Sequence, residues 1–360
     1  MKNIIDYIKD KIYYILGATI IIIVVLLLVS SCSGKSKSYS SIENDMVSAA
    51  KNYYANHKSN LPKEEGNSIK VTIGTLIDYE LLEEVKDPNN KNQTCSGYVE
   101  VTKVGDEYAY TPFLTCKGNY EPEYLVDKIK NSKLDEYGNG VYEMDGEYVY
   151  RGDDVNNYLK FNNQIWRIVK IDDQGDVKIV LAEYTENSYS WDSSYNSESG
   201  YNTGITTNYL NTQIRKTLKS YYEDNFSKES KSKIVSKNLC VGRYSKSDNF
   251  SVEKECSILK EAEKIGLLNA SDYKNASLDQ GCNNIDSIEC SNYNYLASDG
   301  IKTWLLNASS ENTYKVYNLS KRIYLSNASN QKRINPVIYI TNKSITMVGK
   351  GTIKEPYEIK

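Results

Sequence analysis

The chain has 360 residues, with 44 basic and 47 acidic side chains and a formal net charge of −3. Because the two signs nearly cancel, nothing in the charge argues for nucleic acid or another polyanion as a partner. The roughly 330 residues behind the apolar N-terminal stretch suffice for two domains, each with its own core.

The first 32 residues (1–32) are the predicted signal or anchor segment. Ile12 to Val29 contains no charge, and its 18 residues would make about 27 Å of helix against a bilayer core of about 30 Å. Val29-Ser30-Ser31-Cys32 resembles the lipobox of bacterial lipoprotein signal peptides, in which the cysteine carries the lipid. Two alternatives therefore stand: lipid attachment at Cys32, or an uncleaved transmembrane helix. Both predict membrane lipid as a partner and place residues 33–360 on the extracellular face of the cell membrane.

The cysteine count also points outside the cytosol. Seven cysteines are present, and six can pair if Cys32 carries lipid. No Cys-x-x-Cys spacing supports zinc, and the single histidine, His57, cannot form a His-rich site alone. The sequence therefore predicts disulfides, no metal site and no other cofactor.

A short tether and a small α+β domain are expected next. Residues 33–41 are rich in serine and predict a flexible tether, followed by the small domain over 42–120. Ser40 and Glu43 have the spacing of a capping box, and apolar residues follow at helical spacing. A first helix is therefore predicted to run to about His57.

A second helix is predicted behind Thr72, which can cap the stretch IGTLIDYELLEE. Asp87-Pro88 should end this helix, because the residue before a proline avoids the helical region. The small domain thus begins with two helices before its hairpin.

The stretch CSGYVEVTKVGDEYAYTPFLTC predicts a β-hairpin with a fixed register. Gly105-Asp106 suits a two-residue turn, and pairs across it have position numbers that sum to 211. Cys95 and Cys116 fall on a non-hydrogen-bonded pair of that register, where Cα atoms approach most closely. Pro112 falls opposite Val99 in another such pair, so its missing N–H costs no ladder bond. The hairpin therefore predicts a disulfide between Cys95 and Cys116.

Four cysteines remain once this pair is made. The nearest-neighbour choice among three connectivities joins Cys240 with Cys256 and Cys282 with Cys290. Loops of this size would each add roughly 2 to 3 kcal/mol if unstrained.

The order of anchor, helix and small sheet, with a cysteine pair late in the domain, resembles pilin-like proteins. The stretches AAKNYYANHKSNLP, VTIGTLIDYELLEEVKDP and CSGYVEV are also similar to a region of uncharacterised membrane-anchored surface proteins of Bacillota-type bacteria. This resemblance covers about 80 residues and implies a pilin-like fold for the first ectodomain.

A charged linker is expected over 121–140, followed by a sheet-dominated domain over 141–360. Short alternating segments separated by turns predict its strands. These segments are VYEMDGEYVY, YLKF, QIWRIVKI, DVKIVLAEY, IGLLNA, KTWLLNA, RIYLSNA, NPVIYI and SITMV. One helix is predicted behind a Thr206-Thr207 cap, from the stripe of Leu210, Ile214, Leu218 and Tyr222. The fold class is therefore α+β.

These segments follow, in order, a domain of unknown function that is common in bacterial surface proteins. The match includes YVYRGDDVNNYLKFNNQIWRIVKI, SYSWDSSYN, TNYLNTQIRKTLKSYYEDNF, IGLLNASDY, TWLLNASS, INPVIYI and GKGTIKEPYEI. That domain is distantly similar to the C-type-lectin-like fold shared with formylglycine-generating enzymes. The resemblance implies display and binding more readily than a reaction.

The loop from Ser188 to Thr203 is the candidate ligand-binding surface. Long loops on a rigid scaffold are disproportionately functional, and Tyr, Ser, Asn and Trp are typical of binding loops. The candidates are Trp191, Asp192, Tyr195 and Tyr201. A glycan or protein on the envelope or a host surface is the expected ligand, with Trp191 as an exposed contact. A disordered surface insertion is the alternative.

Three further motifs have plainer readings. Arg151-Gly152-Asp153 spells an integrin-binding tripeptide but is expected as a turn between strands. Asp172, Asp173 and Asp176 could bind calcium, yet a solvated hairpin turn is favoured. Asn-Ala-Ser occurs four times and is expected as strand-edge composition, at Asn269, Asn275, Asn307 and Asn327.

No spacing singles out a catalytic pair of carboxylates, so no catalytic residue is predicted. The sequence and its resemblances together predict a membrane-tethered extracellular binding or adhesion protein of the bacterial cell surface, without enzymatic activity. A pilin-like assembly or secretion component and a cell-envelope-processing enzyme are the alternatives.

Overall fold

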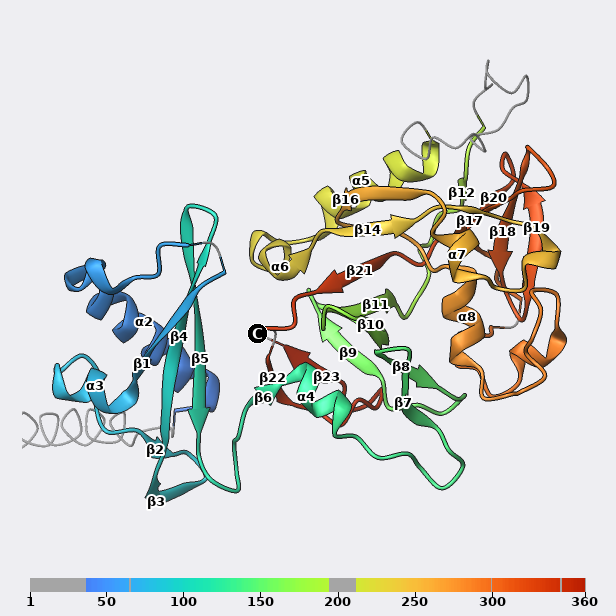
Figure 1. The fold of residues 1–360 in the computed structure, drawn as a ribbon. Helices are drawn as coiled ribbons and strands as arrows, with labels where there is room; N and C mark the ends of the chain where they lie inside the picture. The colour runs from blue at the N-terminus through green and yellow to red at the C-terminus, as the bar shows by residue number, and fades with distance from the viewer. Residues whose placement is uncertain (1–36, 65, 194–211, 299, 344, 360) are drawn as a thin grey trace, which may run out of the picture. The chain divides into compact units, whose positions relative to one another are not determined.

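The computed structural model describes residues 37–359 apart from 65, 194–211, 299 and 344, and divides the chain into two compact units, 1–121 and 122–360 (Figure 1). The anchor segment, with Cys32, lies outside the described residues. Among the helices of the described ranges, none combines the length and the apolar character needed to cross a membrane.

The first unit is a small α+β fold. Within its described residues, three strands form a sheet in the order β1-β4-β5, and β2 pairs with β3. Its elements are α2 (Tyr39–Asn56), η1 (Lys58–Asn60), β1 (Ser68–Thr72), α3 (Ile73–Asp78), β2 (Lys86–Asp87), β3 (Asn90–Thr94), β4 (Ser96–Val104) and β5 (Glu107–Thr115).

Helix α2 lies against the sheet of β1, β4 and β5 (Figure 1). Its cap is Ser38 rather than Ser40, because the Ser38 hydroxyl accepts a hydrogen bond from the Ser41 N–H at 3.2 Å. Glu43, expected to close a capping box, is instead buried and accepts a hydrogen bond from the Tyr120 hydroxyl at 2.9 Å. The buried apolar residues are Ile42, Met46, Ala49, Ala50 and Tyr54.

The second helix is shorter than its sequence suggests. Thr72 caps α3 as predicted, accepting from the Thr75 N–H at 3.0 Å. The helix ends at Asp78, and Glu80 then takes a left-handed φ of 56°. A side chain in that conformation is strained, which stops the helix well before Asp87-Pro88. Residues 81–85 are therefore neither helix nor strand.

The predicted hairpin is confirmed in full. Strands β4 and β5 pair from Val104 opposite Glu107 outward, and Val99 lies opposite Pro112. Cys95 and Cys116 form a disulfide with their Cα atoms 4.5 Å apart. Strand β1, which the sequence did not predict, adds to the other edge of β4.

The second unit is built on a large sheet. In its described part, ten strands form this sheet, whose main path runs β13-β21-β11-β10-β9-β23-β22-β6, with the β7–β8 hairpin joined through β10. Its strands are β6 (Glu123–Tyr124), β7 (Gly140–Met144), β8 (Glu147–Arg151), β9 (Tyr158–Phe161), β10 (Gln164–Ile171), β11 (Val177–Leu181), β13 (Ile234–Val235), β21 (Val337–Ile340), β22 (Ile345–Val348) and β23 (Tyr357–Ile359).

Smaller sheets and helices surround this sheet. Strands β15 (Arg243–Tyr244), β17 (Thr303–Ser309), β18 (Lys315–Leu319) and β19 (Ile323–Asn327) pair in that order, as do β12 (Tyr189–Ser190) with β20 (Gln331–Lys332), and β14 (Lys237–Cys240) with β16 (Leu259–Glu263). The helices are α4 (Leu125–Lys130), α5 (Gln213–Asn225), α6 (Lys228–Lys233), η3 (Lys246–Asp248), α7 (Val252–Glu255), α8 (Ala270–Ala276) and η4 (Ile288–Ser291).

Successive side chains of the central strands β10 and β11 pack into two separate hydrophobic clusters. Ile168 and Ile179 pack in the cluster that also holds Trp166 and the buried face of α5, whereas Val169 and Val180 pack with residues of β17 and β18. This alternation is the period of two that a strand imposes on its side chains. Strands β10 and β11 are therefore buried on both faces at these positions.

Three sequence predictions need correction here. Residues 122–140 are no linker, because Tyr124 pairs with Ile345 and the side chains of Leu125 and Ile129 are fully buried beside the sheet. The segment IGLLNA is no strand, because Asn269 caps helix α8. The predicted helix begins later than expected, at Gln213 behind a Thr212 cap, and Thr206-Thr207 lies outside the described residues.

Candidate functional site

A polar cleft of about 750 Å³ opens over one face of the large sheet. Its floor is a row of side chains from neighbouring strands: Val149 on β8 pairs with Lys170 on β10, which pairs with Lys178 on β11, which pairs with Tyr339 on β21. Residues of β14, α7 and α8 complete the lining. The volume lies in the range of small-molecule sites.

Two adjacent lysines on this floor each form an ion pair with a different carboxylate. Lys178 Nζ lies 2.6 Å from Asp272 Oδ2, and both side chains are at most 5 % exposed. Lys170 Nζ lies 2.6 and 2.8 Å from the two carboxylate oxygens of Glu147. Like charges directly opposite one another destabilise a sheet, so each lysine depends on its own carboxylate.

The local sequence around Asp272 explains why it reaches the floor. Asp272 is the third residue of α8, and its Oδ2 accepts a hydrogen bond from the Asn269 N–H at 2.7 Å. The same oxygen also accepts a hydrogen bond from Lys178 Nζ, so the helix cap and the ion pair share one carboxylate. This ties the start of α8 to the central strand β11.

Lys170 and Tyr339 on the floor stay protonated at neutral pH. Burial lowers the pKa of Lys170 and so does Lys178, but Asp272, Tyr339 and Glu147 raise it further, and the net change is upward. Burial raises the pKa of the Tyr339 hydroxyl. The floor therefore presents hydrogen-bond donors and compensated charges rather than a base poised near neutrality.

One edge of the cleft is held by a partly buried lysine. Lys237 on β14 donates to Asp172 and Asp176 at 2.7 and 2.6 Å and to Gln174 Oε1 at 2.8 Å. The hydrogen bonds with both aspartates raise the pKa of Lys237 although burial lowers it. The Asp172–Asp176 turn, expected to be simply solvated, is thus clamped to β14 by a side-chain cation.

A disulfide and a carboxylate fix the part of the wall made by β14, α7 and α8. Cys240 on β14 is bonded to Cys256, which directly follows α7. Glu255 accepts a hydrogen bond from the Ser271 N–H at 3.2 Å, which links α7 to α8. The third disulfide joins Cys282 and Cys290, so all three predicted pairings are confirmed.

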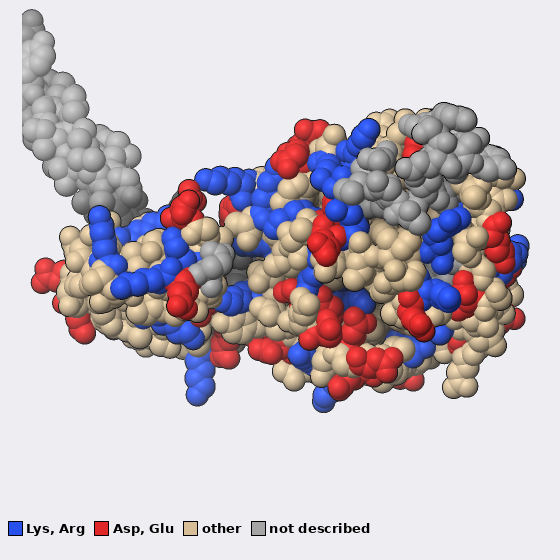
Figure 2. Space-filling view, turned by 45° about the horizontal axis from the view of Figure 1, so that its top comes forward, with Lys and Arg blue, Asp and Glu red and all other residues tan. Residues whose placement is uncertain are grey.

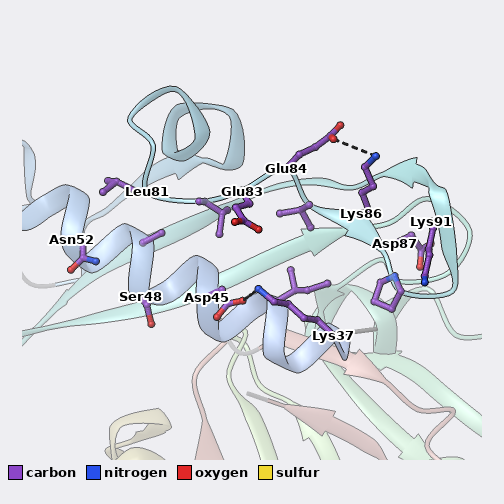
Figure 3. Close-up of a pocket in the computed structure, with 15 residues that line it drawn as sticks. Lys37, Asp45, Ser48, Asn52, Leu81, Glu83, Glu84, Lys86, Asp87 and Lys91 are labelled. Carbon is purple, nitrogen blue, oxygen red and sulfur yellow. Dashed lines mark hydrogen bonds and ion pairs between the residues drawn. The ribbon is translucent and has the colours of Figure 1, made fainter. Parts of the chain in front are cut away.

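The first unit has its own hollow, a groove of about 550 Å³ that we call the α2 groove. Figure 3 shows α2 with Asp45, Ser48 and Asn52 on one side and the chain from Leu81 to Lys91 on the other. Apolar and small residues from both sides lie between them: Ile42, Ala49, Leu81, Leu82, Val85 and Pro88.

The candidate loop residues are placed differently from the expectation. Trp191 is 3 % exposed, and its Nε1 donates to the Leu305 carbonyl at 3.2 Å, so it is a core residue and not an exposed contact. Asp192 is also buried. Tyr195 and Tyr201 lie outside the described residues. The two candidates that the structure describes, Trp191 and Asp192, are thus both buried.

The integrin-type tripeptide is part of the folded frame. The Arg151 guanidinium donates to the Ser277 carbonyl at 2.6 and 3.1 Å, and Gly152 has a φ of 121°. A Cβ at Gly152 would come within 1.9 Å of Asn139 Oδ1, so only glycine fits this approach. The tripeptide is thus not a free loop tip.

The Asn-Ala-Ser segments are structural. Buried Asn307 accepts a hydrogen bond from the Ala270 N–H at 3.0 Å and donates to the Gly242 carbonyl at 3.3 Å. The four alanines of these segments are buried as well: Ala270, Ala276, Ala308 and Ala328. The motif therefore marks close packing more than a strand edge.

The cleft cannot be recognised in the sequence because its residues come from segments far apart in the chain. Lys178 and Asp272 are 94 positions apart. A possible signal was the interruption of buried strands by lysines at positions 170 and 178.

Figure 2 shows acidic and basic side chains interspersed over the face drawn. Comparison of the chain with family models, with curated proteins and with solved structures found no match.

Proposed function

We propose that the chain is a membrane-tethered extracellular recognition protein of the bacterial cell surface, and that its second unit binds a ligand in the polar cleft without catalysing a reaction. The observation that carries the proposal is the cleft floor, where two lysines and two carboxylates are preorganised as ion pairs. Groups that are already paired can exchange hydrogen bonds with a ligand but are poor proton donors or acceptors for a reaction.

The compartment is supported by the disulfides. Each unit has at least one disulfide among its described residues, and such bonds persist in oxidising compartments. The anchor would be lipid on Cys32 or the helix from Ile12 to Val29. Cys32→Ser separates the two routes, because it should abolish lipid labelling only if the lipobox is used. Recovery of the full-length chain in a soluble cytosolic fraction would contradict both.

The fold proposed for the second unit is C-type-lectin-like, as its resemblance implies. The mixed sheet flanked by helices and by a smaller sheet is in keeping with that class. A ligand rich in hydroxyl groups and without net charge suits the cleft best, because the floor charges compensate one another. Neutral glycans meet this description.

The test uses the full chain in detergent with soluble peptidoglycan fragments and a panel of neutral oligosaccharides. Ser236 is an exposed cleft residue, and Ser236→Trp should fill the cleft and weaken glycan binding at least about tenfold, or about 1.4 kcal/mol. Ser329→Trp, on an exposed serine that does not line the cleft, is the matched control. Absence of binding to every probe, or equal binding by both variants, would refute the cleft as the site, and cleavage of a bound glycan would refute the non-enzymatic role.

A pilin-like assembly role is the second candidate. It is favoured by the packing of α2 across a small sheet whose last strand ends beside the Cys95–Cys116 bond. Concentration-dependent self-association of the full chain, measured by sedimentation, would support it, whereas a monomer at all concentrations would count against it.

A further inference from the structure

The α2 groove has an uncommon wall, a short stretch of chain whose main-chain groups are unpaired. Among the described residues, the backbone N–H and C=O groups of Leu82, Glu83 and Glu84 make no hydrogen bond. These residues follow α3 and precede β2, and they line the groove. Unpaired main chain at an exposed edge is a template for a further strand.

The opposite wall leaves room for such a strand. Ser48, Ala49 and Asn52 on α2 line the groove, and all three side chains are small or short. From Ile42 to Asn52 the helix rises about 15 Å, the length of four or five extended residues. Apolar side chains at Leu81 and Val85 would contact alternate residues of an inserted peptide.

The charges of the groove suggest what the peptide carries. Lys37 is paired with Asp45 at 2.7 Å and Lys86 with Glu84 at 3.5 Å. Glu83 and Lys91 also line the groove; Glu83 helps to raise the pKa of Lys37 through its charge, but neither Glu83 nor Lys91 makes a direct ion pair within the part of the chain that the structure describes. A ligand with a basic and an acidic side chain would complement both.

The geometry points to a peptide-binding role for the first unit: the α2 groove binds an extended peptide of four or five residues, which pairs with the main chain of residues 82–84 and carries one basic and one acidic side chain for Glu83 and Lys91. This role does not depend on the polar cleft. A segment of a second copy is the other possible occupant, and the test distinguishes it.

The probe is a phage-displayed library of random 12-residue peptides, selected on the immobilised full chain in detergent. Enriched peptides should alternate apolar residues and carry charges of both signs. Hydrogen exchange measured by mass spectrometry should show that a bound synthetic peptide slows exchange at residues 82–84 at least about tenfold.

Asn52→Trp and Asn44→Trp form a matched pair on α2. Both asparagines are exposed, but only Asn52 lines the groove. Asn52→Trp should weaken peptide binding at least about tenfold, and Asn44→Trp should leave it unchanged. If Asn52→Trp fails to fold, Glu83→Pro replaces it, because proline removes one main-chain donor while Glu83→Ala retains it.

Three outcomes would overturn the proposal. The selection could enrich no peptide, the enriched peptides could bind Asn52→Trp as tightly as the wild type, or exchange could slow elsewhere and not at residues 82–84. Protection of residues 82–84 that appears with rising protein concentration and no peptide would identify a second copy as the occupant instead.

Discussion

The two units treat their polar groups in opposite ways. In the second unit, Lys170, Lys178 and Lys237 lie on the floor and edge of a cleft, and each is held by a carboxylate of the same unit. In the first unit, the main chain of residues 82–84 makes no hydrogen bond among the described residues, and Glu83 and Lys91 make no direct ion pair there. Where the polar side chains already pair with one another, a ligand has to replace existing hydrogen bonds. Where main-chain N–H and C=O groups are unpaired, a ligand can add hydrogen bonds as a further strand.

The largest effect should come from Trp191, which belongs to the closed interior of the second unit. Trp191→Ala should lower the free energy of unfolding by about 3 to 5 kcal/mol, because it removes a buried indole and leaves a cavity. Urea unfolding followed by tryptophan fluorescence measures this, since all three tryptophans lie in the second unit. Trp191→Phe should cost less. A loss below about 1 kcal/mol would restore the interpretation of Trp191 as an exposed contact.

Breaking the cleft floor should cost nearly as much. Lys178→Met leaves Asp272 buried and unpaired, which typically costs about 3 to 5 kcal/mol. The double variant Lys178→Met/Asp272→Leu should recover much of that loss. The control in the first unit is Lys37→Met, which removes an exposed pair and should change stability by at most about 1 kcal/mol. Equal losses of stability in Lys178→Met and Lys37→Met would show that the buried pair in the second unit contributes no more than the exposed pair in the first.

The disulfides should act on one unit each. Cys240→Ser/Cys256→Ser should lower the stability of the second unit by about 3 kcal/mol, as expected for a loop of this length. Cys95→Ser/Cys116→Ser should leave the tryptophan-detected transition in place and destabilise only the first unit, which far-ultraviolet circular dichroism should reveal as a separate transition. A shift of the tryptophan transition in the second variant would show that the units unfold together.

The smallest effect concerns pH in the first unit. Burial and a hydrogen bond to Asp87 raise the pKa of Tyr39 to about 12. The unfolded pKa is about 10, so this contribution is complete below pH 10 and is lost as the pH rises toward 12. Burial would raise the pKa of Asp87, but hydrogen bonds from Asn119 and Tyr39 give a net lowering. The contribution of Asp87 is therefore present above pH 4 and lost below it.

Circular dichroism of the first unit at a series of pH values tests both signs. Tyr39→Phe should remove the loss at alkaline pH, and Asp87→Asn should remove the loss at acid pH. A Tyr39→Phe variant that still loses stability between pH 10 and 12 to the same extent would show that Tyr39 is not responsible.

The sequence predicted what depends on neighbouring residues. The register of β4 and β5, the Cys95–Cys116 bond and the Thr72 cap follow from a turn and from sequence separations of at most 21 residues. Strand β1 was missed because its pairing to β4 spans 30 residues and its own pattern is too short to identify. The sequence also misread IGLLNA as a strand, since the Asn269–Asp272 capping box that starts α8 was not recognised.

The candidate site was largely beyond sequence reasoning. The loop around Trp191 has the composition of a binding surface, but burial of the indole depends on the Leu305 carbonyl, 114 residues away. The cleft depends on which strands become neighbours, because Tyr339 joins Lys178 only through the β11–β21 pairing. No local pattern specifies that order, since β21 follows β11 by more than 150 residues.

The Lys237 ammonium lies between the carboxylates of Asp172 and Asp176. A covalently attached cation cannot dissociate, so this turn is shaped at any external calcium concentration and in the presence of chelators. The conformation of the turn therefore depends on the charge of Lys237 and not on the calcium concentration. Because the pKa of Lys237 is raised, the side chain keeps this charge well into the alkaline range. The substitution Lys237→Ala would remove this internal cation. The carboxylates of Asp172 and Asp176 would then repel each other, and a free cation could relieve that repulsion.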